Sequence, residues 1–128
     1  MQEQMKKIYI AGAYSGKTKE ERDLNIAHVA AVGREIARLR KGIPIMPHMN
    51  SAKFEDLAPD IPKDFWLEGD IEIMKSCDAV IFIAGWDRSP GAVKEMEEAK
   101  KAKMLIYRQS FVKVEVEENK ENSNEIKE

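Results

Sequence analysis

The chain has 128 residues, of which 43% are hydrophobic and 34% charged, and its formal net charge is −2. This length is enough for one domain with a buried core, and the small net charge argues against nucleic acid as a partner. The single cysteine, Cys77, excludes a disulfide framework and a cysteine-rich zinc site. No signal-like segment precedes the first predicted strand and no apolar run could span a bilayer, so we expect a cytoplasmic protein with no membrane partner.

Strands and helices are predicted to alternate along most of the chain. Short apolar runs predict strands over residues 6–11, 43–46, 78–84 and 104–107, and helical periodicity predicts helices over 18–40, 62–76 and 89–103. We expect an irregular connection over 51–61. Residues 111–116 alternate apolar and charged side chains, which predicts an edge strand or a partner contact. The charged segment 117–128 is predicted to be a disordered tail.

This order of elements predicts an α/β fold over residues 1–116. We expect a single-domain, doubly wound parallel sheet of the Rossmann or flavodoxin-like kind, with helices on both faces. In such sheets ligands bind at the carboxyl ends of the strands. The first three predicted strands are followed by Tyr14 and Ser15, by His48, and by Trp86 to Gly91, respectively. This convergence favours a small-molecule site over a scaffolding role.

The stretch from Gly85 to Glu95 joins a predicted buried strand to a predicted helix. Ser89 followed by Pro90 is typical of a helix start, and the free N–H groups there favour an anion. On a helical wheel Glu95 falls on the buried arc with Ala99, one turn from this anion site. The pattern alone allows two interpretations: a functional carboxylate directed inward, or a glutamate at the edge of the arc that reaches water.

Asp70 lies in the middle of the apolar arc of the predicted helix 62–76. A carboxylate there is costly unless it is paired, hydrogen-bonded or protonated. Because perturbed carboxylates cluster at functional sites, Asp70 is a candidate acid or base. The alternative is a structural aspartate that caps a loop or binds an arginine.

The segment from Ala11 to Thr18 also fits a loose phosphate-loop pattern, which would make the chain an ATP-binding protein. In that case Lys17 would contact phosphates and Thr18 a magnesium ion. Alanine at the first position weighs against this, so we favour a turn at Gly16 and a helix cap at Thr18.

Other candidates are His48, which would donate to a ligand or make a local hydrogen bond, and Trp86, which would stack on a base or close the core. No His, Asp or Glu cluster has metal-ligand spacing, so neither a metal nor a cofactor is expected.

Three blocks of the sequence resemble the nucleoside 2-deoxyribosyltransferase superfamily. They are Ile8-Tyr9-Ile10-Ala11-Gly12, then Gly69-Asp70, then Ser89-Pro90-Gly91-Ala92-Val93-Lys94-Glu95, and the resemblance covers about residues 6–107. It implies that Glu95 is the nucleophile that attacks C1′ of the sugar and that Asp70 handles the proton of the departing base. It also implies that Tyr9 orients Glu95.

The position six residues before Glu95 helps to choose between activities within this superfamily. Base-exchanging transferases typically carry an aspartate there, whereas Ser89 is similar to the 2′-deoxynucleoside 5′-monophosphate N-hydrolases. A serine at a helix start suits a phosphate, which an aspartate would repel. The remaining residues of the expected phosphate pocket are Gly12, Ser15, Gly16, Arg88 and Gly91, with Ser110 from a neighbouring subunit of a homodimer.

The resemblance therefore implies a hydrolase that cleaves the base–sugar bond of nucleoside 5′-monophosphates through a glycosyl-glutamate intermediate. Tyr14, His48 and Trp86 are expected pocket contacts, and the small-molecule partner is a nucleoside or nucleotide. The alternatives are base exchange between deoxynucleosides, a phosphate-loop protein and a non-catalytic nucleotide-binding module.

Overall fold

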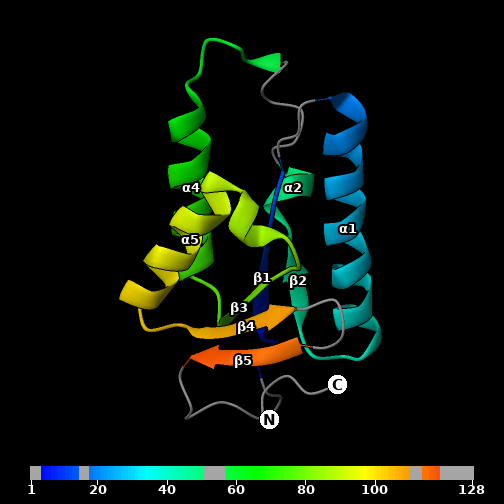
Figure 1. Ribbon diagram of the computed structural model, residues 1–128. Helices are drawn as coiled ribbons and strands as arrows, with labels where there is room; N and C mark the ends of the chain where they lie inside the picture. The colour runs from blue at the N-terminus through cyan, green and yellow to red at the C-terminus, as the bar shows by residue number, and fades with distance from the viewer. Residues whose placement is uncertain (1–3, 15–17, 51–56, 110–113, 119–128) are drawn as a thin grey trace.

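The computed structural model describes residues 4–14, 18–50, 57–109 and 114–118. One five-stranded sheet forms its centre, with strand order β2-β1-β3-β4-β5 (Figure 1). The first four strands are parallel, and β5 pairs antiparallel with β4. The strands are β1 (Lys7–Ala11), β2 (Ile43–Ile45), β3 (Ala79–Phe82), β4 (Leu105–Gln109) and β5 (Val114–Glu118). The fold is therefore the expected α/β, doubly wound arrangement.

Helices cover both faces of the sheet. In Figure 1, α1 lies on one side of the strands, and α4 and α5 lie on the other. The helices are α1 (Lys19–Arg38), α2 (Pro47–Asn50), α4 (Lys63–Lys75), the short 3-10 helix η1 (Trp86–Arg88) and α5 (Pro90–Lys101).

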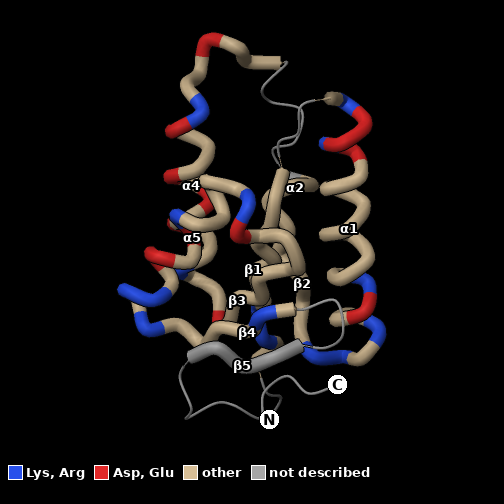
Figure 2. The backbone as a smooth tube through the Cα atoms, in the orientation of Figure 1, with Lys and Arg blue, Asp and Glu red and all other residues tan. Residues whose placement is uncertain are grey.

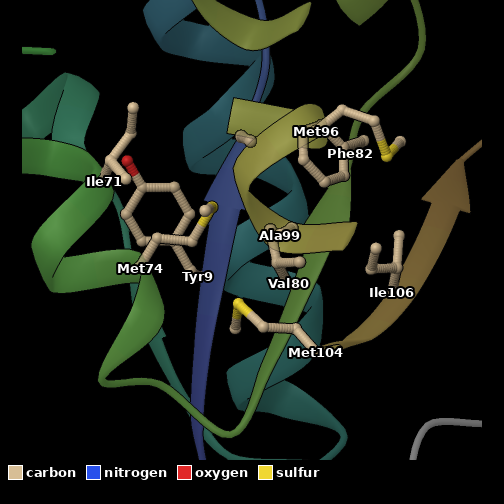
Figure 3. Close-up of a cluster of buried hydrophobic side chains, with 10 residues drawn as sticks. Tyr9, Ile71, Met74, Val80, Phe82, Met96, Ala99, Met104 and Ile106 are labelled. Atoms are coloured by element: carbon tan, nitrogen blue, oxygen red, sulfur yellow. The ribbon is translucent and has the colours of Figure 1, made fainter. Parts of the chain in front are cut away.

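The core has two layers because successive residues of a strand point to opposite faces of the sheet. Ile8 and Ile10 of β1 belong to the cluster that packs against α1, through Val29 and Ile36. Tyr9 belongs to the opposite cluster, which is formed with side chains of α4 and α5 (Figure 3). This alternation directs the tyrosine of β1 toward the two helices that carry the candidate carboxylates.

Side-chain caps begin two helices as predicted. The hydroxyl of Thr18 accepts a hydrogen bond from the Glu21 N–H at the start of α1, and Ser89 accepts one from Ala92 at the start of α5. Lys and Arg gather at the carboxyl-terminal ends of both helices (Figure 2), where they interact favourably with the helix dipole.

Three differences from the predicted elements concern helix α2, the ends of the apolar stripes, and strand β5. Residues 47–50 form helix α2, whereas the sequence predicted only the end of a strand there. Leu39 and Ile73, apolar residues of the predicted helices 18–40 and 62–76, are 49% and 39% exposed. The predicted strand 111–116 is displaced to Val114–Glu118, so residues 117 and 118 belong to the sheet and not to the expected tail. Residues 51–56 and 119–128 lie outside the described ranges.

None of the helices in the described ranges combines the length and the hydropathy of a membrane-spanning segment.

Candidate active site

A hydrogen bond joins the centre of β1 to α5. The Tyr9 hydroxyl donates to Oε2 of Glu95 across 2.6 Å, and both side chains are buried, with exposed fractions of 0% and 6%. In Figure 3 the Tyr9 ring lies on the face of β1 that α4 and α5 cover, beside Ile71 and Met74. Glu95 therefore points inward, and the alternative in which it reaches water is wrong.

Helix α5 buries Glu95 because of its sequence spacing. Ala92, Met96 and Ala99 are buried on the same side of the helix, and Met96 and Ala99 pack into the cluster that contains Tyr9. Since Glu95 lies within this arc, docking the helix on the sheet carries the carboxylate into the interior. The hydrogen bond from Tyr9 partly compensates for the water that the carboxylate loses.

Asp70 of α4 lies within electrostatic range of this pair. Desolvation is the main cause of the raised pKa of both Tyr9 and Glu95, and the charge of Asp70 raises both further. The Asp70 side chain is half-buried beside the buried Ile71. The prediction that Asp70 belongs to an apolar arc is thus confirmed. A salt bridge between Lys75 and Glu98, with a 3.4 Å separation of Nζ and Oε1, joins α4 to α5.

Burial perturbs the acidity of all three side chains. Desolvation raises the pKa of Glu95 to about 7, although the hydrogen bond from Tyr9 opposes the shift. Desolvation alone raises the pKa of Asp70 to about 6. Burial and the Glu95 charge raise the pKa of Tyr9 well above its usual value, so that Tyr9 remains a hydrogen-bond donor at neutral pH.

Burial favours the protonated form of both carboxyl groups, and it acts more strongly on Glu95 than on Asp70. With a pKa of about 7 for Glu95 and about 6 for Asp70, the form that carries one proton holds it mainly on Glu95. The physical reason is that Glu95 is buried more deeply than Asp70.

A second group of side chains lies where β1 and β2 end. His48 is 5% exposed, and its Nε2 lies 2.8 Å from the carbonyl oxygen of Ala13. Its ring also meets Tyr14 edge-on, with ring centroids 5.4 Å apart. His48 therefore makes a local hydrogen bond, which was one of the two interpretations of the sequence, and burial lowers its pKa.

Trp86 packs against Phe82, with ring centroids 5.3 Å apart, and the guanidinium of Arg108 lies 5.6 Å from the Trp86 ring centre. These contacts confirm that Trp86 closes the apolar cluster on this face. Its predicted stacking on a base stays a prediction. Arg88 is exposed at the end of η1.

The glycines of the expected phosphate pocket have different surroundings. A Cβ on Gly12 would lie 2.4 Å from Cγ1 of Ile83, so packing between β1 and β3 requires a glycine there whatever the ligand. A Cβ on Gly91 would make only ordinary contacts, the nearest being 3.8 Å from Leu67, so the protein's own packing does not require this glycine. The predictions for Ser15, Gly16, Lys17 and Ser110 lie outside the described residues.

Two polar residues at this edge of the sheet escaped the sequence analysis. Asn25 donates from Nδ2 to the carbonyl oxygen of Tyr14 across 3.1 Å. Gln109 accepts at Oε1 from the N–H of Ala84, 3.0 Å away, and lies 3.2 Å from Nε2 of His28. Asn25 could have been noticed because it precedes Val29, Gly33 and Ile36 on the buried stripe of α1. Nothing in the pattern around Gln109 marks it.

The fold and the site together define a doubly wound α/β protein with a buried tyrosine–carboxylate pair beside a second carboxyl group. The chain belongs to the DUF4406 family, which is described as a domain of unknown function and matches residues 6–108. No curated protein matches the chain. Among the residues that the structure describes, no group of three His, Cys, Asp or Glu side chains could hold a metal ion.

Proposed function

We propose that this protein is an N-glycosidase that hydrolyses the base–sugar bond of nucleoside 5′-monophosphates, with Glu95 as nucleophile. The observation that carries the proposal is the buried hydrogen bond from Tyr9 to Glu95, with Asp70 in electrostatic range. A retaining glycosidase needs two carboxyl groups of different protonation on either side of the bond that breaks. The resemblance to the nucleoside 2-deoxyribosyltransferase superfamily supports the same assignment.

In this mechanism the ionised carboxylate of Glu95 attacks C1′ of the sugar. The bond between C1′ and the base nitrogen breaks, its electron pair goes to the base, and Asp70 gives the base a proton. Water then attacks C1′ of the glycosyl ester while Asp70 takes a proton from it, which releases the sugar phosphate and restores Glu95. Tyr9 holds Oε2 of Glu95, which leaves Oε1 outside this bond as the attacking oxygen of the mechanism.

The start of α5 supplies the preference for a phosphate. Ser89, which caps this helix and precedes Gly91, stands at the position where base-exchanging enzymes carry an aspartate. The helix start therefore has no carboxylate at this position to repel a phosphate. Helix N-termini bind anions through their free N–H groups and the helix dipole. We therefore place the 5′-phosphate at Ser89 and Gly91, with Arg88 nearby. Completion of the pocket by Ser110 of a second subunit, in a homodimer, is part of the same proposal.

Base release from a panel of nucleosides and 5′-monophosphates, followed by chromatography, tests the proposal. We expect release from at least one monophosphate, and a loss of at least about 1,000-fold in Glu95→Gln, which keeps the shape of the side chain and an acceptor for Tyr9. Glu97→Gln, an exposed position on the same helix, is the matched control and should keep full activity. Unchanged base release in Glu95→Gln would contradict the proposal.

The same assay separates hydrolysis from base exchange. A second free base is added, and a hydrolase gives sugar phosphate in an amount equal to the released base. Formation of a new nucleoside or nucleotide would instead favour the transferase alternative.

A further inference from the structure

The chain that follows β1 is held by side chains from two other elements. His48, at α2, contacts the carbonyl oxygen of Ala13, and Asn25, on α1, donates to the carbonyl oxygen of Tyr14. Because a carbonyl oxygen only accepts hydrogen bonds, Nε2 of His48 must carry the hydrogen. Two consecutive carbonyls are thus each bound by a side-chain donor.

Such bonds determine which way the intervening peptide faces. In a trans peptide the C=O and N–H point in opposite directions, so fixing the Ala13 carbonyl also fixes the direction of the Tyr14 N–H. An anion is attracted by N–H groups and repelled by carbonyl oxygens. Turning the Ala13 carbonyl toward His48 therefore directs the N–H of the same peptide to the opposite side, which favours an anion there.

The neighbouring strands are held by a similar contact. Gln109 of β4 accepts from the N–H of Ala84, just after β3, and from His28 of α1. Since Oε1 of the amide also only accepts, Nε2 of His28 is the donor. Donors from α1 and α2 thus fix the chain at the ends of β1, β3 and β4, so this edge of the sheet is preorganised.

We propose that His48 is a positioning residue that orients the Ala13–Tyr14 peptide for binding of the substrate's 5′-phosphate. This inference rests on the proposed function, because it assigns the phosphate to this edge of the sheet. His48 suits the task because it is buried and fixed on both sides, by Ala13 and by the ring of Tyr14. It touches no reacting atom, so its loss should weaken binding of the phosphate without changing the chemical step.

The test compares a monophosphate with its parent nucleoside in two variants. His48→Phe keeps a ring against Tyr14 but has no donor for Ala13, and His48→Gln keeps a donor. For His48→Phe we expect KM for the monophosphate to rise about tenfold, with kcat and the nucleoside KM changed by less than about twofold. His48→Gln should bring the monophosphate KM to within about threefold of wild type. Ser76→Ala, which removes a bond to the Ile73 carbonyl at the end of α4, is the matched control and should change neither KM.

Equal changes for both substrates, a change in kcat alone, or a His48→Gln variant no better than His48→Phe would overturn the inference. If wild type releases no base, the proposed function fails, and dissociation constants for the same two compounds, measured by titration calorimetry, replace KM in the comparison. Failure of wild type to bind the monophosphate would overturn both proposals. Circular dichroism on each variant shows whether it is folded, and if His48→Phe unfolds, His48→Leu takes its place in the same comparison.

Discussion

Glu95 and Asp70 are two carboxyl groups with unequal surroundings, and that inequality determines how they share a proton. Glu95 is buried and receives a hydrogen bond from Tyr9, whereas Asp70 is half-buried and is perturbed by desolvation alone. The bond from Tyr9 stabilises the ionised form of Glu95, which is the form that attacks. Without this bond Glu95 would hold its proton still more tightly.

The pKa values predict a narrow, bell-shaped pH profile for kcat/KM. The reaction requires that Glu95 and Asp70 hold one proton between them. Activity should therefore rise as pH increases through about 6 and fall as pH increases beyond about 7. Below the first value both groups are protonated and Glu95 cannot attack; above the second both are ionised and Asp70 cannot donate. Rates of base release between pH 4.5 and 9 measure both limbs.

The variant Tyr9→Phe tests which limb belongs to Glu95. Removing the hydroxyl raises the pKa of Glu95, so the alkaline limb should move to higher pH while the acidic limb stays in place. The maximum should fall at least about tenfold, because a hydrogen bond to the charged nucleophile is lost. Movement of the acidic limb instead would mean that Glu95 is the more acidic group, contrary to our assignment.

At the scale of single elements, two helices end in a Schellman motif whose left-handed residue is not glycine. After α1, the N–H groups of Arg40 and Lys41 bond to the carbonyls of Ala37 and Ile36, which is a Schellman motif. After α5, the N–H groups of Lys103 and Met104 bond in the same way to the carbonyls of Lys100 and Ala99, so Lys103 occupies the position that Arg40 has after α1. Arg40 and Lys103 have positive φ angles of 58° and 57°, in the left-handed region that favours glycine. Both ends therefore store backbone strain.

Relief of this strain should stabilise the protein. Arg40→Gly removes the Cβ that makes the left-handed conformation costly, and after the entropic cost of glycine we expect the free energy of unfolding to rise by about 0.5–1 kcal/mol. Urea unfolding measures the change. Arg40→Ala removes the same charged side chain but keeps Cβ, and it should change the stability by less than about 0.3 kcal/mol. A variant Arg40→Gly less stable than Arg40→Ala would refute this explanation.

These helix ends show where local patterns predict structure well and where they do not. Thr18 and Ser89 were predictable as caps because a capping side chain bonds to a backbone group three residues away. The sequence predicted that the helix would end at residue 40, close to Gly42, yet the left-handed residue is Arg40 and not the glycine. The displacement of β5 has another cause: alternation continues from Val112 to Glu117, so the pattern alone does not fix where pairing begins.

In the whole molecule, the chain leaves β1 in one direction to form β2 and returns on the other side to form β3. Ligands in doubly wound sheets bind at this reversal. The carboxyl end of β1 lies there, and Tyr9 lies two residues before it. Helical wheels placed Glu95 on a buried arc and Asp70 in an apolar arc but did not decide whether Glu95 reached water, and its hydrogen-bond partner Tyr9 is 86 residues away in the chain. The contacts of Tyr9 with Glu95 and of His48 with Ala13 both depend on the tertiary fold. Only the family resemblance predicted the contact between Tyr9 and Glu95.

The most direct test of the central claim is to trap the sugar on the enzyme. A reactive monophosphate is mixed with the protein, the reaction is quenched in acid within milliseconds, and the digested peptides are analysed by mass spectrometry. We expect the added mass of a sugar phosphate on Glu95 of the α5 peptide in wild type, and no adduct in Glu95→Gln. An adduct on Asp70, or base release at full rate by Glu95→Gln, would contradict the account.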